Sequence, residues 1–445
     1  MAAESYEVSD DMTVYRFVLR EELLFHNGEP ATAQYVVMNW QKVLDPATGF
    51  QCLPFFDGSS GAKVVSVEAE DDRTVVIRLD RPSAVFLEKL AYIQCPVAVL
   101  HPDSWDADGN WVKPIGTGPY RFSEWREGRY VLLEKFKQYV PRTEPASGLA
   151  GRKVAHADTL RYVVITDLMA IKAAVVSGQI DVASYLAPVT ALELRHNRRV
   201  EANDEQGLSR RTLLIQTADP LMSNVSLRRA MAHALDLETF AEVASLGHAQ
   251  HNPSTLPVGL KQHTDLHARR YAYDPDKSRS LLAEAGYDGE EIVLTTTREE
   301  QAYFDMAMIA EAMWQEVGLN VRVEVLELGS LLSKYFQGGY QVMAFEYSPR
   351  LTATMNLQTL LGDKAVTPNR WDDALANDLL SRVSATPDPS DQQAIFDRIH
   401  ERMMDQVPVI NIYNAPIVDV TSKRIRGYEP WPGAKPRLWN VEVIE

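Results

Sequence analysis

Helical and strand patterns alternate along the whole chain, and this alternation is the feature that most limits its fold. Residues 14–20 alternate Tyr15, Phe17 and Leu19 with polar neighbours, as a half-buried strand does. Thr32 stands where an N-cap is expected before an apolar helical stripe. The same patterns predict further strands at 74–79, 120–125, 129–136, 160–165, 181–185 and 321–325, with 160–165 expected to be buried.

Helix-capping residues mark the ends of several predicted helices. Asp167 precedes one helical segment, and Ser177-Gly178 ends it. Asp274-Pro275 opens another helix, and Gly286 follows its last residue. Helical stripes also cover residues 306–317 and 391–406. Helices alternating with strands in this way predict mixed α/β lobes.

Length and charge narrow the function classes. A chain of 445 residues exceeds what one core usually serves, so two or three domains are expected. A net charge of −16 argues against nucleic acid or an anionic membrane as a partner, because both attract basic surfaces. The first residues have neither the basic start nor the apolar run of a signal peptide.

No motif in the sequence carries catalytic or metal-binding chemistry. Neither a Gly-x-Ser-x-Gly elbow nor a His-Glu-x-x-His pair occurs. His248 and His251 are three residues apart, but a metal site needs more ligands, so we interpret them as loop histidines. Cys52 and Cys95 fit two buried thiols better than a disulfide, and cysteine usage leaves the compartment open. We therefore expect no catalytic residues, metal or cofactor.

The stretch PIGTGPYRF, residues 114–122, has the glycines of a phosphate loop but not its other residues. No Gly-Lys-Ser/Thr follows, and Pro119 removes a backbone donor. Residues 120–122 have the pattern of a strand rather than of a helix start. A phosphate-binding role is therefore not expected here.

Six ordered blocks resemble one protein family. They are PIGTGPYRFSEWREGRYVLLEKF, YRFVLREELLFHNGEPATAQYVVMNWQKVLDP, SGQIDVASY, LRRAMAHALDLETF, YDPDKSRSLLAEAGY and IFDRIHERMMDQVPVINIYN. Together they span essentially the whole chain in the order of the extracytoplasmic solute-binding proteins of ABC importers, in the dipeptide/oligopeptide/nickel branch (solute-binding protein family 5). In that family the glycine loop turns the chain, and the resemblance implies unusual backbone angles at Gly116 and Gly118.

The resemblance implies an α/β fold of the periplasmic-binding-protein type (type II, three-domain cluster). Residues 1–113 would form a peripheral inserted domain, incomplete at its start. Residues 114–216 and 419–445 would form lobe I, and residues 217–418 the closing lobe II. Hinge crossings would lie near 216–220 and 413–418. Family members carry about 60 to 70 further residues before the point matching Met1, so the chain resembles an N-terminally truncated member.

The resemblance also points to a ligand site. Peptide-binding relatives hold the ligand's ammonium with an aspartate, and the matching position here is Arg350, with Tyr347 at the aromatic position before it. An arginine suits a carboxylate or phosphate instead. We expect an anionic group of the solute at Arg350, with Arg211 as a second cation; the alternative is that Arg350 points to solvent or pairs with Glu346. Tyr347, Tyr413 and Trp431 are candidate aromatic walls or ordinary core residues.

The function implied is that of a non-enzymatic substrate-binding component of an ABC transporter, which closes over a small organic solute (a peptide, an opine-like conjugate or similar). Its partner would be a membrane permease, its location periplasmic or otherwise extracytoplasmic, and its state monomeric. One alternative is a cytosolic ligand sensor with the same fold. Another is an unrecognised hydrolase on this scaffold, which would turn its ligand over.

Overall fold

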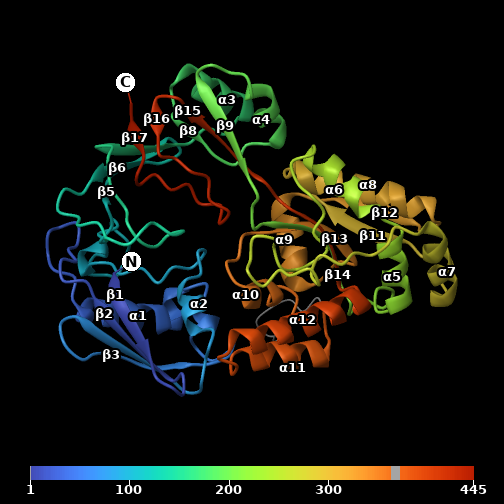
Figure 1. The fold of residues 1–445 in the computed structure, drawn as a ribbon, viewed down its shortest axis with the longest axis horizontal. Coiled ribbons are helices and arrows are strands. Elements are labelled where there is room, and N and C mark those ends of the chain that lie inside the picture. The colour runs from blue at the N-terminus through green and yellow to red at the C-terminus, as the bar shows by residue number, and fades with distance from the viewer. Residues whose placement is uncertain (1, 362–370, 445) are drawn as a thin grey trace. The chain divides into compact units, whose positions relative to one another are not determined.

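The computed structural model describes residues 2–361 and 371–444 (Figure 1). The chain divides into two compact units. The first comprises Met1–Asp204, Ile417–Trp431 and Lys435–Glu445, and the second Glu205–Pro416 and Pro432–Ala434. Both units mix helices with sheets, as the alternating sequence pattern predicts. The finer division of the first unit into residues 1–113 and a lobe I stays a prediction.

The first unit begins with an antiparallel sheet in the order β1-β2-β4-β3. Its strands are β1 (Ala3–Val8), β2 (Val14–Leu19), β3 (Val64–Ala69) and β4 (Thr74–Leu79). The helices α1 (Ala33–Leu44) and α2 (Phe86–Leu90) supply Trp40 and Phe86 to a core with Tyr15 and Phe56. The sequence predicted β2, β4 and α1 from alternation and an apolar stripe, and these three elements are confirmed.

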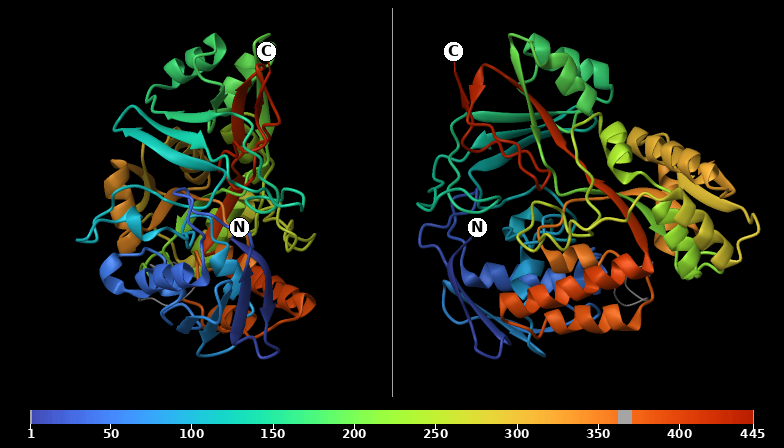
Figure 2. Two further views of the ribbon diagram at one scale, coloured as in Figure 1. Left: turned by 90° about the vertical axis from the view of Figure 1, so that its left-hand side faces the viewer. Right: turned by 45° about the vertical axis from the view of Figure 1, so that its right-hand side comes forward.

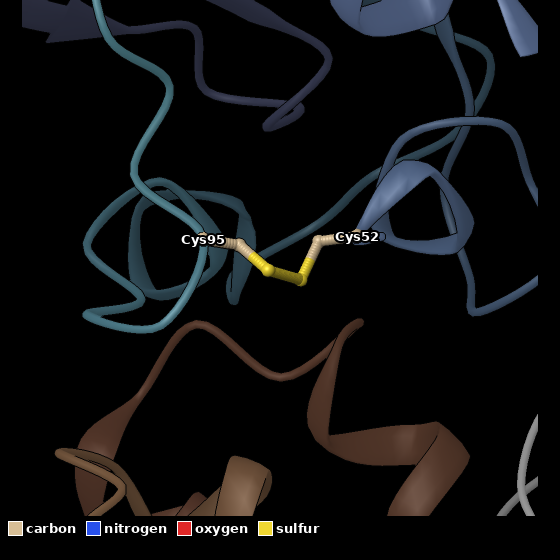
Figure 3. Close-up of a disulfide and its surroundings, with 2 residues drawn as sticks. All are labelled: Cys52 and Cys95. Carbon is tan, nitrogen blue, oxygen red and sulfur yellow. A yellow bond between two sulfur atoms is a disulfide. The ribbon is translucent and has the colours of Figure 1, made fainter. Parts of the chain in front are cut away.

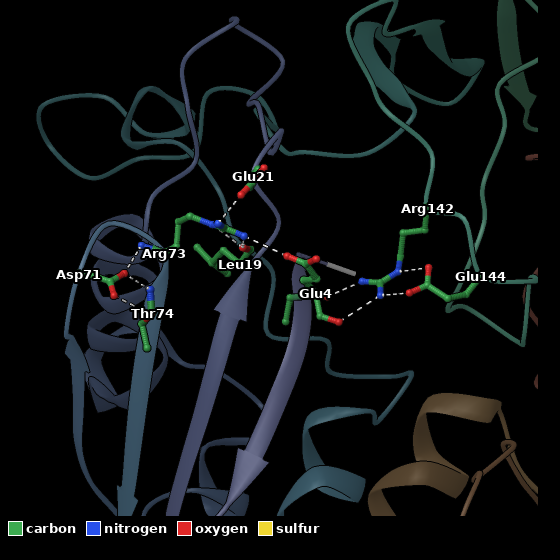
Figure 4. A network of polar contacts seen from close by, with 9 residues as sticks. Glu4, Leu19, Glu21, Asp71, Arg73, Thr74, Arg142 and Glu144 are labelled. Atoms are coloured by element: carbon green, nitrogen blue, oxygen red, sulfur yellow. Dashed lines mark hydrogen bonds and ion pairs between the residues drawn. The ribbon is translucent and has the colours of Figure 1, made fainter.

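Two arginines hold the edge of this sheet (Figure 4). Arg73 donates to the carbonyl of Leu19 and pairs with Glu4 at 2.9 Å. Arg142, which follows the strand β6 (Tyr130–Lys135) in the chain, donates to the carbonyls of Ala3 and Glu4 at 2.5 and 3.1 Å. The guanidinium of Arg142 therefore ties β1 to a segment more than a hundred residues away.

A disulfide joins Cys52 to Cys95 across a sequence separation of 43 residues (Figure 3). Both cysteines are buried. The preference for two free thiols was therefore wrong. Sequence spacing could not reveal the pair, because only the tertiary fold brings the loops before and after β3, β4 and α2 together.

The first unit also contains two three-stranded sheets, in the orders β5-β6-β7 and β8-β15-β9. Their strands are β5 (Tyr120–Arg126), β6 (Tyr130–Lys135), β7 (Thr159–Val163), β8 (Val182–Ala183), β9 (Val200–Glu205) and β15 (Ile417–Ser422). The helices α3 (Leu168–Ser177) and α4 (Pro188–Leu194) complete this part, and β16 (Ile425–Arg426) pairs with β17 (Glu442–Val443).

The strand β7 was expected to be buried, and this expectation was wrong. Its residues Tyr162 and Val163 are exposed, as are Val164 after it and Leu168 and Met169 at the start of α3. Within the described residues β7 pairs with β6 alone, so it lies at the edge of its sheet. An apolar run predicts a strand but does not show whether a neighbour covers it.

His26 holds the glycine loop at residues 114–118. Its Nδ1 accepts from the amide of Gly116 at 3.2 Å, and its Nε2 lies 3.1 Å from the carbonyl of Gly118. Neither glycine has a positive φ angle, so the unusual backbone angles implied by the resemblance are wrong. The loop turns the chain through hydrogen bonds to a histidine that precedes it by 90 residues.

The second unit contains a five-stranded sheet in the order β12-β11-β13-β10-β14. Its strands are β10 (Arg210–Ile215), β11 (Ile292–Thr296), β12 (Val321–Val325), β13 (Val342–Tyr347) and β14 (Val409–Asn414). The strand β11 is parallel to β12 and β13, whereas β10 is antiparallel to β13 and β14.

The second unit also contains helices. They are α5 (Val225–His233), α6 (Leu237–Ser245), α7 (Pro275–Ala285), α8 (Gln301–Glu316), α9 (Leu328–Gln337), α10 (Ala353–Leu357), α11 (Ala374–Val383) and α12 (Pro389–Gln406). Figures 1 and 2 show α11 and α12 side by side. The core buries Trp314 and Met306 of α8 with Phe240 of α6 against the sheet.

The aspartate caps predicted for α3 and α7 are confirmed, whereas Thr32 stands at the N-cap position of α1 without a side-chain hydrogen bond. The side chains of Asp167 and Asp274 accept from the amides of Ala170 and Lys277, and Gly178 and Gly286 end their helices in the left-handed conformation. Local side-chain chemistry alone therefore located both ends of α3 and α7. Among the described residues, no helix combines the length and the apolar character needed to cross a bilayer.

Candidate functional site

The strand β10 begins with two consecutive arginines, and its register places them on opposite faces of the sheet. Arg210 is the cross-strand partner of Tyr347, and Arg211 is the partner of Glu346. Neighbouring residues in a strand point to opposite faces, so each arginine meets a different set of side chains.

Arg211 lies on the face that carries Glu346 and Tyr413. Its Nε is 2.8 Å from Glu346 Oε2, and its Nη1 donates to the Tyr413 hydroxyl at 2.6 Å. The hydroxyl of Tyr413 in turn donates to the carbonyl of Ala244. Burial acts to lower the pKa of Arg211, but the charge of Glu346 outweighs it and the pKa is raised. Arg211 is thus neutralised within the unit.

Arg210 lies on the other face, and within residues 2–361 and 371–444 no carboxylate pairs with it. Its side chain is 1% exposed, and its guanidinium carbon is 4.7 Å from the centre of the Tyr347 ring. Its Nη2 donates to Thr359 Oγ1 at 2.8 Å and its Nη1 to Asn411 Oδ1 at 3.4 Å, while Nε has no hydrogen-bond partner in the part of the chain that the structure describes. Burial lowers the pKa of Arg210 to about 9.

A buried charge without an opposite charge is costly. The penalty is several kcal/mol per ion even after the surroundings relax. No ion pair among the described residues includes Arg210, whose polar neighbours are the neutral side chains of Thr359 and Asn411. The face of the sheet around Tyr347 is therefore electropositive.

Arg350 also lies close to the Tyr347 ring. Its guanidinium carbon is 5.4 Å from the ring centre, and its Nη1 donates to the carbonyl of Ser348 at 2.8 Å. The side chain is half-buried, and its charge contributes to lowering the pKa of Arg210. Two guanidinium groups thus converge on one tyrosine ring, which Tyr335 and Phe345 flank at 6.2 and 5.3 Å.

The five residues predicted from the sequence fall into three places. Arg211 and Tyr413 share one face of the sheet, and Tyr347 and Arg350 lie near the other. Trp431 belongs to the first unit, where Arg437 lies over its ring. The alternative that Arg350 pairs with Glu346 is wrong, because Glu346 pairs with Arg211.

Arg210 is the cation that sequence reasoning missed. The motif SRRTLLIQ contains both arginines, and either could have been chosen. The two arginines differ in the face of the sheet that they occupy, because Arg210 and not Arg211 lies opposite Tyr347.

Three histidines form a separate cluster in the second unit. The ring centres of His263 and His267 are 5.8 Å apart, and those of His267 and His400 are 4.6 Å apart. Burial lowers the pKa of His267 to about 4 and that of His400 to about 3, helped in His400 by repulsion from His267. Within residues 2–361 and 371–444, no set of three His, Cys, Asp or Glu side chains is arranged to hold a metal ion.

Comparison with known proteins places the whole chain in one family. The profile of the bacterial extracellular solute-binding proteins, family 5 middle region, matches residues 1–368. The probable peptide ABC transporter periplasmic-binding protein y4tO of Sinorhizobium fredii is 26% identical, over 98% of this chain and 84% of its own length. The glutathione-binding protein GsiB of Escherichia coli K12 is 24% identical, over 96% of this chain and 82% of its own.

Solved structures share the fold. The putative peptide-binding protein AppA from Clostridium difficile superposes with a TM-score of 0.86 at 18% identity, covering 99% of this chain and 91% of its own. AgaA from Agrobacterium tumefaciens R10, solved with agropinic acid, superposes with a TM-score of 0.79 at 24% identity, covering 100% and 89%. The chain therefore belongs to the bacterial extracellular solute-binding proteins of family 5.

Proposed function

We propose that this chain captures a small organic solute bearing an anionic group and presents it to the permease of an ABC importer. Family membership supports the solute-binding role. The observation that supports the anionic group is the position of Arg350, half-buried over Tyr347 and without an ion-pair partner among the described residues. A guanidinium in this setting favours a carboxylate or phosphate oxygen.

The names of the relatives fit such a solute. They include a peptide transporter component, a glutathione-binding protein and a complex with agropinic acid. Glutathione and agropinic acid carry carboxylates. An opine-like conjugate or a peptide bound through its carboxylate would satisfy Arg350, whereas a ligand offering only an ammonium group would be repelled.

Solute capture is proposed to proceed by lobe closure. Residues 217–418 would close over the ligand about crossings near 216–220 and 413–418, and the closed form would be favoured by contacts made only there. Tyr413, Arg211 and Trp431 remain proposed cleft residues. Small-angle scattering of the monomer with and without solute tests this step, and an unchanged radius of gyration at saturation contradicts it.

An extracytoplasmic location is favoured over the cytosolic sensor. The matching family is extracellular, and the disulfide between Cys52 and Cys95 suits an oxidising compartment. We also propose that the protein releases the solute chemically unchanged. Mass spectrometry after incubation tests this, because any turnover would support a hydrolase instead.

The deciding experiment is a thermal-shift screen of peptides, glutathione and opine-type acids, followed by calorimetry on each hit. We expect Arg350→Ala to weaken binding of an acidic hit at least tenfold, about 1.4 kcal/mol. Arg382→Ala is the control, because Arg382 is an exposed arginine of the same unit. Equal affinity in wild type and Arg350→Ala would refute the role of Arg350.

A further inference from the structure

Arg210 is surrounded by groups that bind it without neutralising it. Thr359 and Asn411 accept hydrogen bonds from its Nη atoms, and the face of the Tyr347 ring covers it. The hydroxyl of Thr359 also donates to the carbonyl of Asn356, which orients its lone pairs towards the guanidinium. Every one of these groups is formally neutral.

The adjacent arginine shows that the fold can supply a carboxylate at this point of the sheet. Arg211, one residue later, has Glu346 at 2.8 Å. Arg210 is more deeply buried, and among the described residues its hydrogen-bond acceptors are neutral and its Nε is unpartnered. A buried ion of this kind is disfavoured unless an opposite charge is brought to it.

Arg350 also lies over the Tyr347 ring, and its own side chain is more exposed than that of Arg210. Its guanidinium carbon is 5.4 Å from the Tyr347 ring centre, compared with 4.7 Å for Arg210. The two like charges repel each other. An anion beside Tyr347 would relieve both the repulsion and the lack of a counter-charge, and its attraction to Arg210 would be weakly screened because Arg210 is buried.

We propose that Arg210 and Arg350 form a two-guanidinium oxyanion subsite around Tyr347, in which Arg350 binds a carboxylate or phosphate group directly and Arg210 is the buried positioning charge. The inference rests on the proposed function and specifies its solute class. Arg211 has no part in this subsite, because Glu346 already balances it.

A matched pair of buried arginines allows a sharp test. Arg228 is also buried, at 3% exposure, but its guanidinium donates to four backbone carbonyls, those of Met222, Ser223, Gln406 and Val407. Arg228→Met should lower the unfolding temperature, because those carbonyls lose their donor. Arg210→Met should lower the unfolding temperature less than Arg228→Met does, because the substitution removes an unbalanced buried charge along with two hydrogen bonds.

The probes are trialanine against its C-terminal amide, and glutathione against its diethyl ester, measured by calorimetry. At least one free acid should bind wild type tenfold or more tightly than its blocked form. The preference should fall below about threefold in Arg210→Met and persist in Arg228→Met. Equal binding of acid and blocked form by wild type, or an unchanged preference in Arg210→Met, would overturn the subsite and leave solute binding intact.

A second arm uses inorganic phosphate against chloride at equal ionic strength, and it applies even if no organic probe binds. Failure of every organic probe counts against the proposed solute class. Phosphate should raise the unfolding temperature of wild type more than that of Arg210→Met. Equal shifts in the two proteins would overturn the oxyanion subsite, and a larger response to phosphate than to either acid would identify phosphate as the preferred group.

Discussion

Arg211 and Glu346 face each other across β10 and β13, with 2.8 Å between Nε and Oε2. The pair balances the charge of Arg211 inside the second unit, and the Tyr413 hydroxyl accepts a further hydrogen bond from the guanidinium. A cation that is satisfied in this way is a structural element of the sheet. The proposed solute therefore has less to gain from Arg211 than from its neighbour Arg210.

Removal of one member of this pair should destabilise the protein. Glu346→Gln leaves the charge of Arg211 unbalanced, and we expect a loss of roughly 2–3 kcal/mol, since a fully buried pair costs about 3–5 kcal/mol to break and these side chains keep some exposure. Denaturant unfolding measures it. Glu291→Gln, which breaks the exposed pair with Arg322, should change stability by less than about 0.5 kcal/mol. Equal losses in the two variants would contradict the assignment.

The affinity for an acidic solute should fall at alkaline pH, because Arg210 loses its positive charge there. Its pKa in the free protein is lowered to about 9, and the ionisable groups facing it are Tyr347, Tyr335 and Arg350. Below pH 9 the guanidinium stays charged, so Arg210 causes no change of affinity with pH in that range. Above pH 9 the charged fraction falls, so affinity should fall in wild type more steeply than in Arg210→Met. Calorimetry from pH 7 to pH 10 gives the two curves, and parallel curves would exclude this titration.

The histidine cluster should make the second unit sensitive to acid. His267 and His400 have folded pKa values of about 4 and about 3, below the ordinary 6.5, with Asp397, His263 and Arg269 as the charged or titratable groups acting on them. As the pH falls below 6.5, these histidines bind protons in the unfolded chain before they do so in the folded protein. Their contribution to the free energy of unfolding is therefore fully present above pH 6.5 and is lost towards pH 4.

His400→Leu tests this dependence. His400 is buried beside His267 and is held near neutral pH as the uncharged imidazole by burial, so an apolar side chain of similar size should cost little stability at pH 7.5. Relative to wild type the variant should gain up to about 1.4 kcal/mol per pH unit between pH 6.5 and pH 4. The exposed His196 serves as the control, since His196→Leu should show no such gain. A pH profile of His400→Leu identical to that of wild type would refute the prediction.

The disulfide should stabilise the first unit. Cys52 and Cys95 close a loop of 43 residues, for which chain entropy predicts an upper value of about 4 kcal/mol. We expect the double variant Cys52→Ser, Cys95→Ser to lose about 2–4 kcal/mol, measured by hydrogen exchange in β3 and β4. Dithiothreitol should lower protection in wild type and have no effect on the variant. Protection that is insensitive to both treatments would show that the bond carries no stability.

Local chemistry in the sequence predicted what depends on a few neighbouring residues. Asp167 and Asp274 marked helix starts because an N-cap needs only the next turn. The exposure of β7 could not be predicted, because it depends on which strands lie beside it. The sequence could not show which face of β10 Arg210 and Arg211 each occupy for a related reason, since a shift of one residue exchanges the faces of a strand.

The exposed apolar side chains of β7 and α3 should affect the solubility of the protein. Molecules that met through Tyr162, Val163 and Leu168 would hide this surface from water, while the net charge of −16 keeps them apart by mutual repulsion. Added salt shortens the range of that repulsion from about 30 Å at 0.01 M to about 3 Å at 1 M. The protein should therefore stay soluble best at low ionic strength. At the same protein concentration, aggregation measured as turbidity should begin earlier at about 1 M salt.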